Sequence, residues 1–307
     1  MKRSYLINWT FEKVALASTL LVITILLVLF VVLYKESSLS LQTFGIWKFI
    51  TSTTWNPPLD KFGGAPAIFG SIVSTVIAIL IAVPVAIGIA IFLTEISPYF
   101  LRTPVGVAIE LLAAIPSIIY GMWGLFYFAP FMRDKVQPII HQTLAKLPLI
   151  GEWFAGYTPG IGLLTASIVL SIMILPFTAA IARDSFNMVP PILKESAYAL
   201  GATKWDVMKD VVIPYTKLGV IGGIILSLGR ALGETMAVTF VMGNQPVIPK
   251  SLLEPATSIT VTLANEFTEA DTDLYLSSLF YLALILFVMS FLIIAIGKFI
   301  FLRKVER

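Results

Sequence analysis

Long apolar runs constrain this chain more than any other feature of its sequence. A run of about 20 apolar residues crosses the hydrocarbon core of a bilayer as a helix. Because lipid offers no hydrogen-bond partners, the backbone of such a run must satisfy its own donors and acceptors. With 58% hydrophobic and 13% charged residues, the chain is predicted to be an all-α integral membrane protein with six transmembrane helices. The expected spans are 14–34, 67–93, 105–128, 160–182, 218–241 and 276–302.

The order of these runs predicts three regions. Residues 1–68 combine a cytoplasmic N-terminus, a first anchor helix at 14–34 and an outer loop; residues 69–300 form the main transmembrane domain; residues 301–307 are a cytoplasmic C-terminus. With the N-terminus inside, most of the 21 Lys and Arg residues lie in cytoplasmic segments, in agreement with the positive-inside rule. A cleaved signal peptide is the alternative for the first run. Its apolar part would be shorter and would end at a small-residue cleavage site, so we expect an uncleaved anchor.

Several classes of function are disfavoured by residue types. The chain has no cysteine and a single histidine, His141, so we expect no metal site and no cofactor. Its basic residues are scattered singly at the ends of apolar runs, which indicates membrane topology and not nucleic-acid binding. No phosphate-binding GxxxxGK[ST] loop occurs, and no serine, histidine and acid are grouped. We therefore expect neither ATP binding nor catalysis by this chain itself.

Residues 194–217 form a long polar stretch on the predicted cytoplasmic side. Gly201 favours the left-handed conformation that ends a helix, and Thr203 with Asp206 forms a capping box that starts another. Helical spacing then predicts an apolar knob, and Pro214 is expected to close the segment. By composition alone, an amphipathic loop lying on the lipid headgroups is an alternative. The residues of the predicted knob are Trp205, Met208 and Val212.

The order of residues in this stretch resembles the EAA loop of ABC importer permeases. That motif reads EAA, three residues, G, nine residues, IxLP; here Ser196 replaces the middle alanine, and Val211 and Ile213 replace the two aliphatic residues. In the family, the loop forms coupling helices that dock in a groove of the ATP-hydrolysing subunit. The resemblance implies that role for Glu195, Ala197, Gly201, Trp205, Met208 and Pro214.

The fifth predicted span carries two charges near the middle of the membrane. Arg230 and Glu234 would cost roughly 2.5 to 3.5 kcal/mol each at the bilayer centre, so they are not expected to face lipid. Spaced four apart on a continuous helix, they would share one face. They could form a buried ion pair that fixes packing or line a substrate path, for which a guanidinium suits a tetrahedral oxyanion. Gly229 and Gly233 beside them favour a close helix contact.

Three motifs together resemble the PstC-type permease subunits of phosphate ABC importers; PstA-type subunits share much of the pattern. The motifs are the EAA variant, SLGRALGETMAV in the fifth span and AAIPSIIYGMWG, with Pro116, in the third. The resemblance implies a type I ABC importer permease fold with a cytoplasmic coupling-helix loop, in a bacterial or archaeal plasma membrane. It further implies import of inorganic phosphate by alternating access, with a PstA-like second permease, two PstB-like ATP-binding subunits and a PstS-like extracytoplasmic binding protein.

Some alternatives remain open on the residues alone. The substrate could be another oxyanion, such as sulfate or molybdate, or Arg230, Glu234 and Glu110 could form the proton relay of an ion-coupled secondary transporter. An intramembrane enzyme is disfavoured because paired catalytic residues in different spans are missing. Glu110 is expected to have a structural role, snorkelling or pairing with a basic residue of the cytoplasmic surface. The acidic outer segment 254–273, with Glu266, is expected to meet a binding protein.

Overall fold

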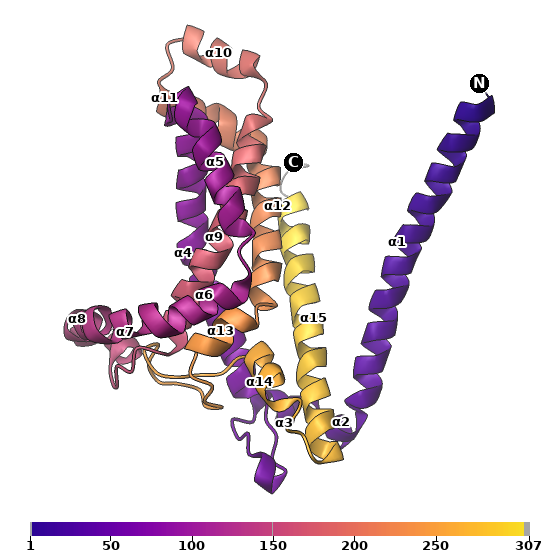
Figure 1. Cartoon of the computed structure of the whole chain (residues 1–307), viewed down its shortest axis with the longest axis vertical. Helices are drawn as coiled ribbons and strands as arrows, with labels where there is room; N and C mark the ends of the chain where they lie inside the picture. Colours follow the sequence, from indigo (N-terminus) through magenta and orange to yellow (C-terminus); the bar gives the residue numbers. More distant parts are fainter. Residues whose placement is uncertain (1, 149, 304–307) are drawn as a thin grey trace.

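The computed structural model describes residues 2–148 and 150–303, and these residues form helices and no strands (Figure 1). Five helices are long and apolar enough to cross a membrane, and a bent pair makes a possible sixth crossing. The prediction of an all-helical membrane fold is therefore confirmed. Four of the long helices cover predicted spans: α1 (Lys2–Glu36), α4 (Ala65–Ile91), α9 (Leu163–Asn187) and α15 (Asp273–Arg303).

Helix α9 lies at the centre of the bundle. Helix α4 packs along it, α12 (Ile213–Leu232) packs against both, and α15 packs against α12. The contact between α4 and α9 consists largely of small or compact side chains, which allow two helix backbones to approach closely inside a membrane. Residues in this buried core include Ala78, Ala82, Ala166, Val169, Leu170 and Met173.

Helix α1 stands apart from the bundle along most of its length (Figure 1). Its apolar side chains are exposed over most of the run, as expected for a helix surrounded by lipid. It contacts α15 and α2 (Ser38–Phe44) near its C-terminal end, where Leu33 is buried. Helix α3 (Ile46–Thr51) then leads toward α4. This first helix is therefore attached to the transmembrane domain at one end only.

The third predicted span is not a straight helix. Helix α5 (Tyr99–Ala113) ends before Pro116, and the helical stretch that starts with α6 (Ser117–Trp123) turns away by 87°. Proline has no backbone N–H and disfavours the helical conformation of the residue before it, so the helix breaks at this point. The predicted span over 105–128 is therefore made of two helices that meet at a sharp bend. The stretch instead runs across the bundle through α7 (Ala129–Phe131) to α8 (Gln137–Thr143) (Figure 1).

The fifth predicted span is also interrupted. Helix α12 ends at Leu232, and a separate short helix, α13 (Met236–Val241), follows. Helix α6 lies against α13: a Cβ atom at Gly121 would come within 3.0 Å of the Ala237 Cα. The continuous helix expected over 218–241 is therefore wrong, because residues 233–235 connect two helices.

The segment before α15 is held by a half-buried acid. Glu266, the last residue of α14 (Ile259–Glu266), accepts hydrogen bonds from Trp55 Nε1 at 2.7 Å and from the Tyr275 hydroxyl at 2.6 Å. Trp55 and Tyr275 are themselves buried and pack against Phe62. The Glu266 carboxylate therefore joins elements of this chain, and the contact of segment 254–273 with a binding protein stays a prediction. Glu269 and Asp271 are exposed and remain candidates for such a contact.

We expect Glu266→Ala to destabilise the fold by about 2–4 kcal/mol, because two buried donors lose their acceptor. Glu269→Ala, an exposed acid three residues further along, should change stability by less than about 0.5 kcal/mol. Thermal unfolding of the two purified variants in the same detergent measures the difference. Equal melting temperatures would contradict the structural role of Glu266.

Candidate functional site

Two short helices form the polar segment that joins α9 to α12. Helix α10 (Pro191–Ala199) is followed by Gly201, whose φ of +88° lies in the left-handed region, and then by α11 (Lys204–Val207). The Thr203 hydroxyl accepts from the Asp206 N–H, and the Asp206 carboxylate accepts from the Thr203 N–H. The bend at Gly201 and the capping box are thus confirmed. Both helices lie at one end of the bundle, beyond the ends of the long helices (Figure 1).

The inner face of this segment is fixed to the bundle. Val207, Met208 and Val212 are buried in a cluster with Phe186 of α9 and Ala90 of α4. Met208 is only 2% exposed, so the prediction that it projects toward a partner is wrong: it anchors the segment. The Lys194 ammonium group of α10 also pairs with the Glu95 carboxylate at the end of α4.

Pro214 does not close the segment. The helical stretch runs without a break from Lys204 to Leu232, through a π-helical turn at Met208–Val212. Pro214 follows this π-helical turn directly, as the second residue of α12, and lies inside the continuous stretch. Helix α11 is therefore continuous with α12.

The outer face of the segment is apolar and uncovered. Leu200 is 90% exposed and Trp205 is 66% exposed. Glu195 and Gly201 are exposed beside them, whereas Ala197 is half-buried. Burial raises the pKa of the Tyr198 hydroxyl, with a smaller effect of the Glu95 carboxylate in the same direction, so this phenol stays neutral. Leu200 was not among the residues predicted from the sequence, although an apolar residue directly before a helix-ending glycine is a usable signal. Other exposed apolar residues here are Met188, Ile192 and Leu193.

Arg230 lies in the last turn of α12 and is exposed on the surface of the isolated chain. Its guanidinium carbon is 5.8 Å from the centre of the Phe177 ring, a cation–π contact. None of the ion pairs among residues 2–148 and 150–303 joins Arg230 to Glu234. The predicted pairing on one helix face is wrong because the helix ends at Leu232, between the two residues.

Glu234 is hydrogen-bonded to two other elements of the chain. Its Oε1 accepts a hydrogen bond from the Ala237 N–H at 3.1 Å, and its backbone carbonyl accepts from the Thr260 hydroxyl at 2.8 Å. It thus stabilises the start of α13 while its second carboxylate oxygen accepts no hydrogen bond from the described residues. The side chain also borders a small cavity lined by hydroxyl groups, those of Ser71, Ser74, Thr75, Ser258 and Thr260.

Two substitutions of Glu234 should distinguish the role of its charge from the role of its hydrogen bond to the Ala237 N–H. Glu234→Gln keeps a side-chain acceptor for the Ala237 N–H, whereas Glu234→Ala removes it and should cost about 1 kcal/mol of stability. We expect transport to change in both variants and thermal stability to fall only in the alanine variant. Equal stability losses in the two variants would contradict the capping role.

The two glycines beside Arg230 differ in their surroundings. A Cβ atom at Gly229 would come 3.1 Å from the Ile294 Cδ1 atom of α15, so this glycine lets α15 approach within the same chain. Gly233 has no such neighbour from another helix. The predicted close contact at Gly229 therefore exists, but its partner is α15. Pro116 lies at the bend between α5 and α6, as described above.

Glu110 of α5 forms an ion pair with Arg183 of α9, with 2.6 Å between Oε1 and Nη2. Pairing with a basic residue was one of the two predicted outcomes; the sequence did not reveal Arg183 as the partner, because it lies 73 positions away. His141 is exposed on α8. Among the residues that the structure describes, no group of three His, Cys, Asp or Glu side chains could hold a metal ion.

Known proteins resemble this chain in sequence and in fold. A permease from Mesorhizobium japonicum, the phosphate transport system permease protein PstC, is 53% identical over 99% of this chain and 92% of its own length. The protein of the same name from Pasteurella multocida is 50% identical over 86% of this chain and 82% of its own length. Such identity over nearly whole lengths implies a shared fold.

Solved structures agree on the architecture. A bacterial alginate ABC transporter superposes with a TM-score of 0.62 over 95% of both chains at 16% identity. The MetNI methionine ABC transporter in an inward-facing conformation superposes with a TM-score of 0.54, covering 80% of this chain at 20% identity. At these identities the likeness concerns the fold alone. The model of one family, described as binding-protein-dependent transport system inner membrane component, matches residues 65–305. The chain therefore belongs to the binding-protein-dependent transport system inner membrane components, the permeases of ABC importers.

Proposed function

We propose that this chain is the permease subunit of an ATP-driven importer of inorganic phosphate. The observation that carries this proposal is the identity of 45–53% to several proteins named as phosphate transport system permeases, over at least 86% of this chain. The chain is a transport component and not an enzyme; ATP hydrolysis belongs to a separate subunit.

The position of Arg230 supports an anionic substrate. An exposed cation in the last turn of a membrane helix is costly against lipid, so we place it on a polar path between this chain and a second permease. Its planar guanidinium donates several hydrogen bonds in a geometry that matches phosphate oxygens. Arg230 would then bind the anion during its passage.

Glu234 favours phosphate over sulfate and molybdate as the substrate. At neutral pH phosphate retains at least one O–H group, whereas fully ionised sulfate and molybdate have none to donate. The free carboxylate oxygen of Glu234 can accept a hydrogen bond from phosphate but would repel an anion that offers no donor. Glu234 would then both stabilise the start of α13 and contact the substrate.

Two uncovered surfaces are available for partner subunits. We assign the outer face around Leu200 and Trp205 to one of two PstB-like ATP-binding subunits, and the face around Arg230 to a PstA-like second permease. A PstS-like extracytoplasmic protein would deliver phosphate at the opposite end. The beginning of α1 and the end of α15 point toward the end that carries α10 and α11 (Figure 1), which supports cytoplasmic termini in a plasma membrane.

Uptake by the complete transporter tests the proposal. The chain is co-purified with its partner subunits, reconstituted into liposomes, and supplied with ATP and the binding protein. We expect uptake of radiolabelled phosphate that requires ATP and that excess sulfate or molybdate does not compete. Uptake driven by a proton gradient without ATP would overturn the proposal in favour of a secondary transporter. Competition by sulfate or molybdate would overturn only the assignment of phosphate.

A further inference from the structure

The small cavity beside Glu234 lies where the break between α12 and α13 meets α4 and the start of α14. Its volume is about 10 Å³, at the lower limit of what one water molecule needs, about 10–15 Å³. A void of this size has room for one particle, so the groups that line it surround the same point. Its oxygen-bearing residues are Ser71, Ser74, Thr75, Glu234, Ser258 and Thr260.

Four of the hydroxyl groups around this cavity already donate their hydrogen elsewhere. Ser71 and Ser74 of α4 donate to the backbone carbonyls four residues before them, at 2.9 and 2.6 Å. Thr260 donates to the Glu234 carbonyl at 2.8 Å, so the Ser258 hydroxyl, 3.1 Å from the Thr260 oxygen, donates to that oxygen. Because a hydroxyl group has a single hydrogen, these four oxygens offer only lone pairs to the cavity.

Thr75 lacks the hydrogen bond that its neighbours make. It is 4% exposed, and its hydroxyl has no hydrogen-bond partner among residues 2–148 and 150–303, whereas Ser71 and Ser74 on the same helix both have one. Burial of a hydroxyl without a partner is costly. Because Thr75 lines the cavity, its free oxygen indicates that the cavity holds something that binds oxygen.

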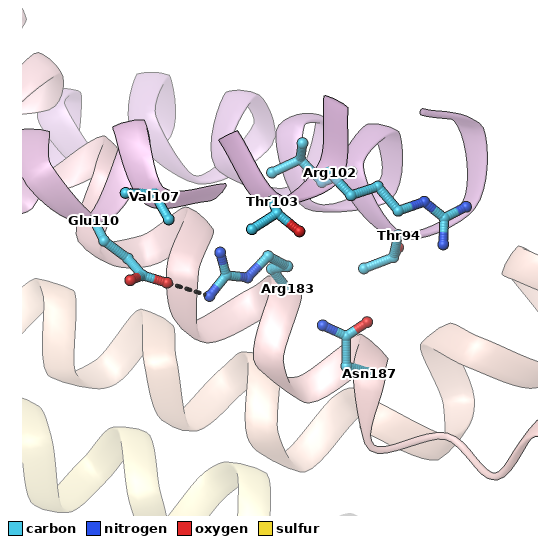
Figure 2. A pocket seen from close by; sticks show the side chains of 8 residues that line it. Thr94, Arg102, Thr103, Val107, Glu110, Arg183 and Asn187 are labelled. Carbon is cyan, nitrogen blue, oxygen red and sulfur yellow. Dashed lines mark hydrogen bonds and ion pairs between the residues drawn. The ribbon is translucent and has the colours of Figure 1, made fainter. Parts of the chain in front are cut away.

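Glu234 brings a charge to the cavity that no cation of the described chain balances. Two other acids of the bundle are paired: Glu110 with Arg183 (Figure 2) and Glu95 with Lys194. Glu234 is in none of the ion pairs of the described residues. The C-terminal end of α12, which carries a partial negative charge, also lines the cavity. The cavity therefore attracts positive charge.

These groups favour a cation over an anion or a water molecule. An anion needs hydrogen-bond donors, and no side-chain N–H lines the cavity. A water molecule makes about three hydrogen bonds and would leave the charge of Glu234 unbalanced. A monovalent cation contacts several oxygens at once and balances that charge, whereas a divalent cation would leave a buried excess charge.

The size of the cavity and its place in the fold select among monovalent cations. Na⁺ is smaller than a water molecule and K⁺ is about as large, so a void at the lower limit for water favours Na⁺. In membrane transporters, Na⁺ is bound at the C-terminal ends of interrupted helices. The end of α12 before the break is such a place.

We propose that this cavity binds one Na⁺ ion, held by the Glu234 carboxylate and the hydroxyl oxygens around it. A carboxylate has about four lone-pair sites, and the Ala237 N–H occupies one, so the ion leaves the cap of α13 in place. It joins α4, α14 and the break after α12. By balancing Glu234, it also leaves the guanidinium of Arg230 to the anion. This last consequence rests on the proposed function; the binding of Na⁺ does not.

Binding of radiolabelled Na⁺ to the purified complete transporter tests the site, without phosphate or ATP and with choline chloride to hold the ionic strength. Thr75→Val removes one oxygen at nearly constant volume, and Ser74→Ala removes another, so a folding defect in one variant leaves the other. Thr216→Val is the matched control: Thr216 is 5% exposed on α12, donates within its own helix, and lies outside the cavity. Size-exclusion profiles check the assembly of each complex.

We expect saturable binding that unlabelled Na⁺ displaces. Thr75→Val and Ser74→Ala should each weaken it about 10-fold or more, as is usual when a group that supports a metal site is removed, and Thr216→Val should bind like the unsubstituted complex. Absence of saturable binding, or equal affinity of all these complexes, overturns the site. Equal displacement by K⁺ overturns Na⁺ as the ion. Because no phosphate is present, failure of the unsubstituted complex to import phosphate would count against the proposed function alone.

Discussion

Replacement of Arg230 with glutamine is expected to reduce phosphate uptake about 100-fold or more while the transporter still assembles. Arg230 makes no ion pair with the described residues and is exposed on the isolated chain, so its loss should cost less than about 1 kcal/mol of stability. Its loss from a phosphate path removes charged hydrogen bonds worth about 1.5–3 kcal/mol each. Initial uptake rates in proteoliposomes and size-exclusion profiles of the purified complex measure the two effects.

Arg133→Gln is the matched control for this prediction. Arg133 is an exposed arginine on the stretch between α7 and α8, far from α12 in the fold, and pairs only with its neighbour Asp134. Its substitution should leave uptake within about twofold of the unsubstituted transporter. If Arg230→Gln transports at the control rate, Arg230 lies outside the path, and the substrate assignment then depends on the relatives alone.

Leu200→Asp should uncouple the permease from its ATP-binding subunit. Leu200 is 90% exposed in the isolated chain, and full burial of a leucine side chain in an interface is worth about 1.5–3 kcal/mol. An aspartate there also brings a charge into the contact, which adds a desolvation penalty. We expect the amount of ATP-binding subunit retained on purification, and transport with it, to fall about 10-fold or more.

The control for the docking surface is Leu59→Asp. Leu59 is 62% exposed in the outer segment that precedes α4, at the opposite end of the bundle from α10. This variant introduces the same charge without touching the proposed interface, so it should retain the ATP-binding subunit fully. Full retention and normal transport by Leu200→Asp would show that this face does not dock the partner.

The break between α12 and α13 separates the two charged residues of the proposed substrate path. Because α12 ends between Arg230 and Glu234, the guanidinium lies on α12, whereas the carboxylate lies in the connection to α13. Glu234 is hydrogen-bonded to α13 and, through Thr260, to α14, whereas α12 is continuous with α11. A shift of α11 by the ATP-binding subunit would therefore move the anion-binding group relative to the acid beside it.

The sequence alone determined the features that depend on neighbours along the chain. Apolar runs long enough to cross a bilayer predict membrane helices because the backbone in lipid has no other way to satisfy its polar groups. The turn at Gly201 and the capping box of Thr203 with Asp206 are equally local. Each of these depends only on residues that are consecutive in the chain, so pattern and propensity are sufficient to find it.

Only the tertiary structure decided where the apolar runs bend and which faces are covered. Pro116 could have been tolerated within a straight helix; α6 instead turns to pack Gly121 against α13. Met208 and Trp205 are both apolar residues of one short segment, yet Met208 is buried under Phe186 while Trp205 is exposed. Arg183 meets Glu110 because α5 and α9 lie side by side. These outcomes depend on contacts between residues far apart in the chain, and local periodicity carries no information about such contacts.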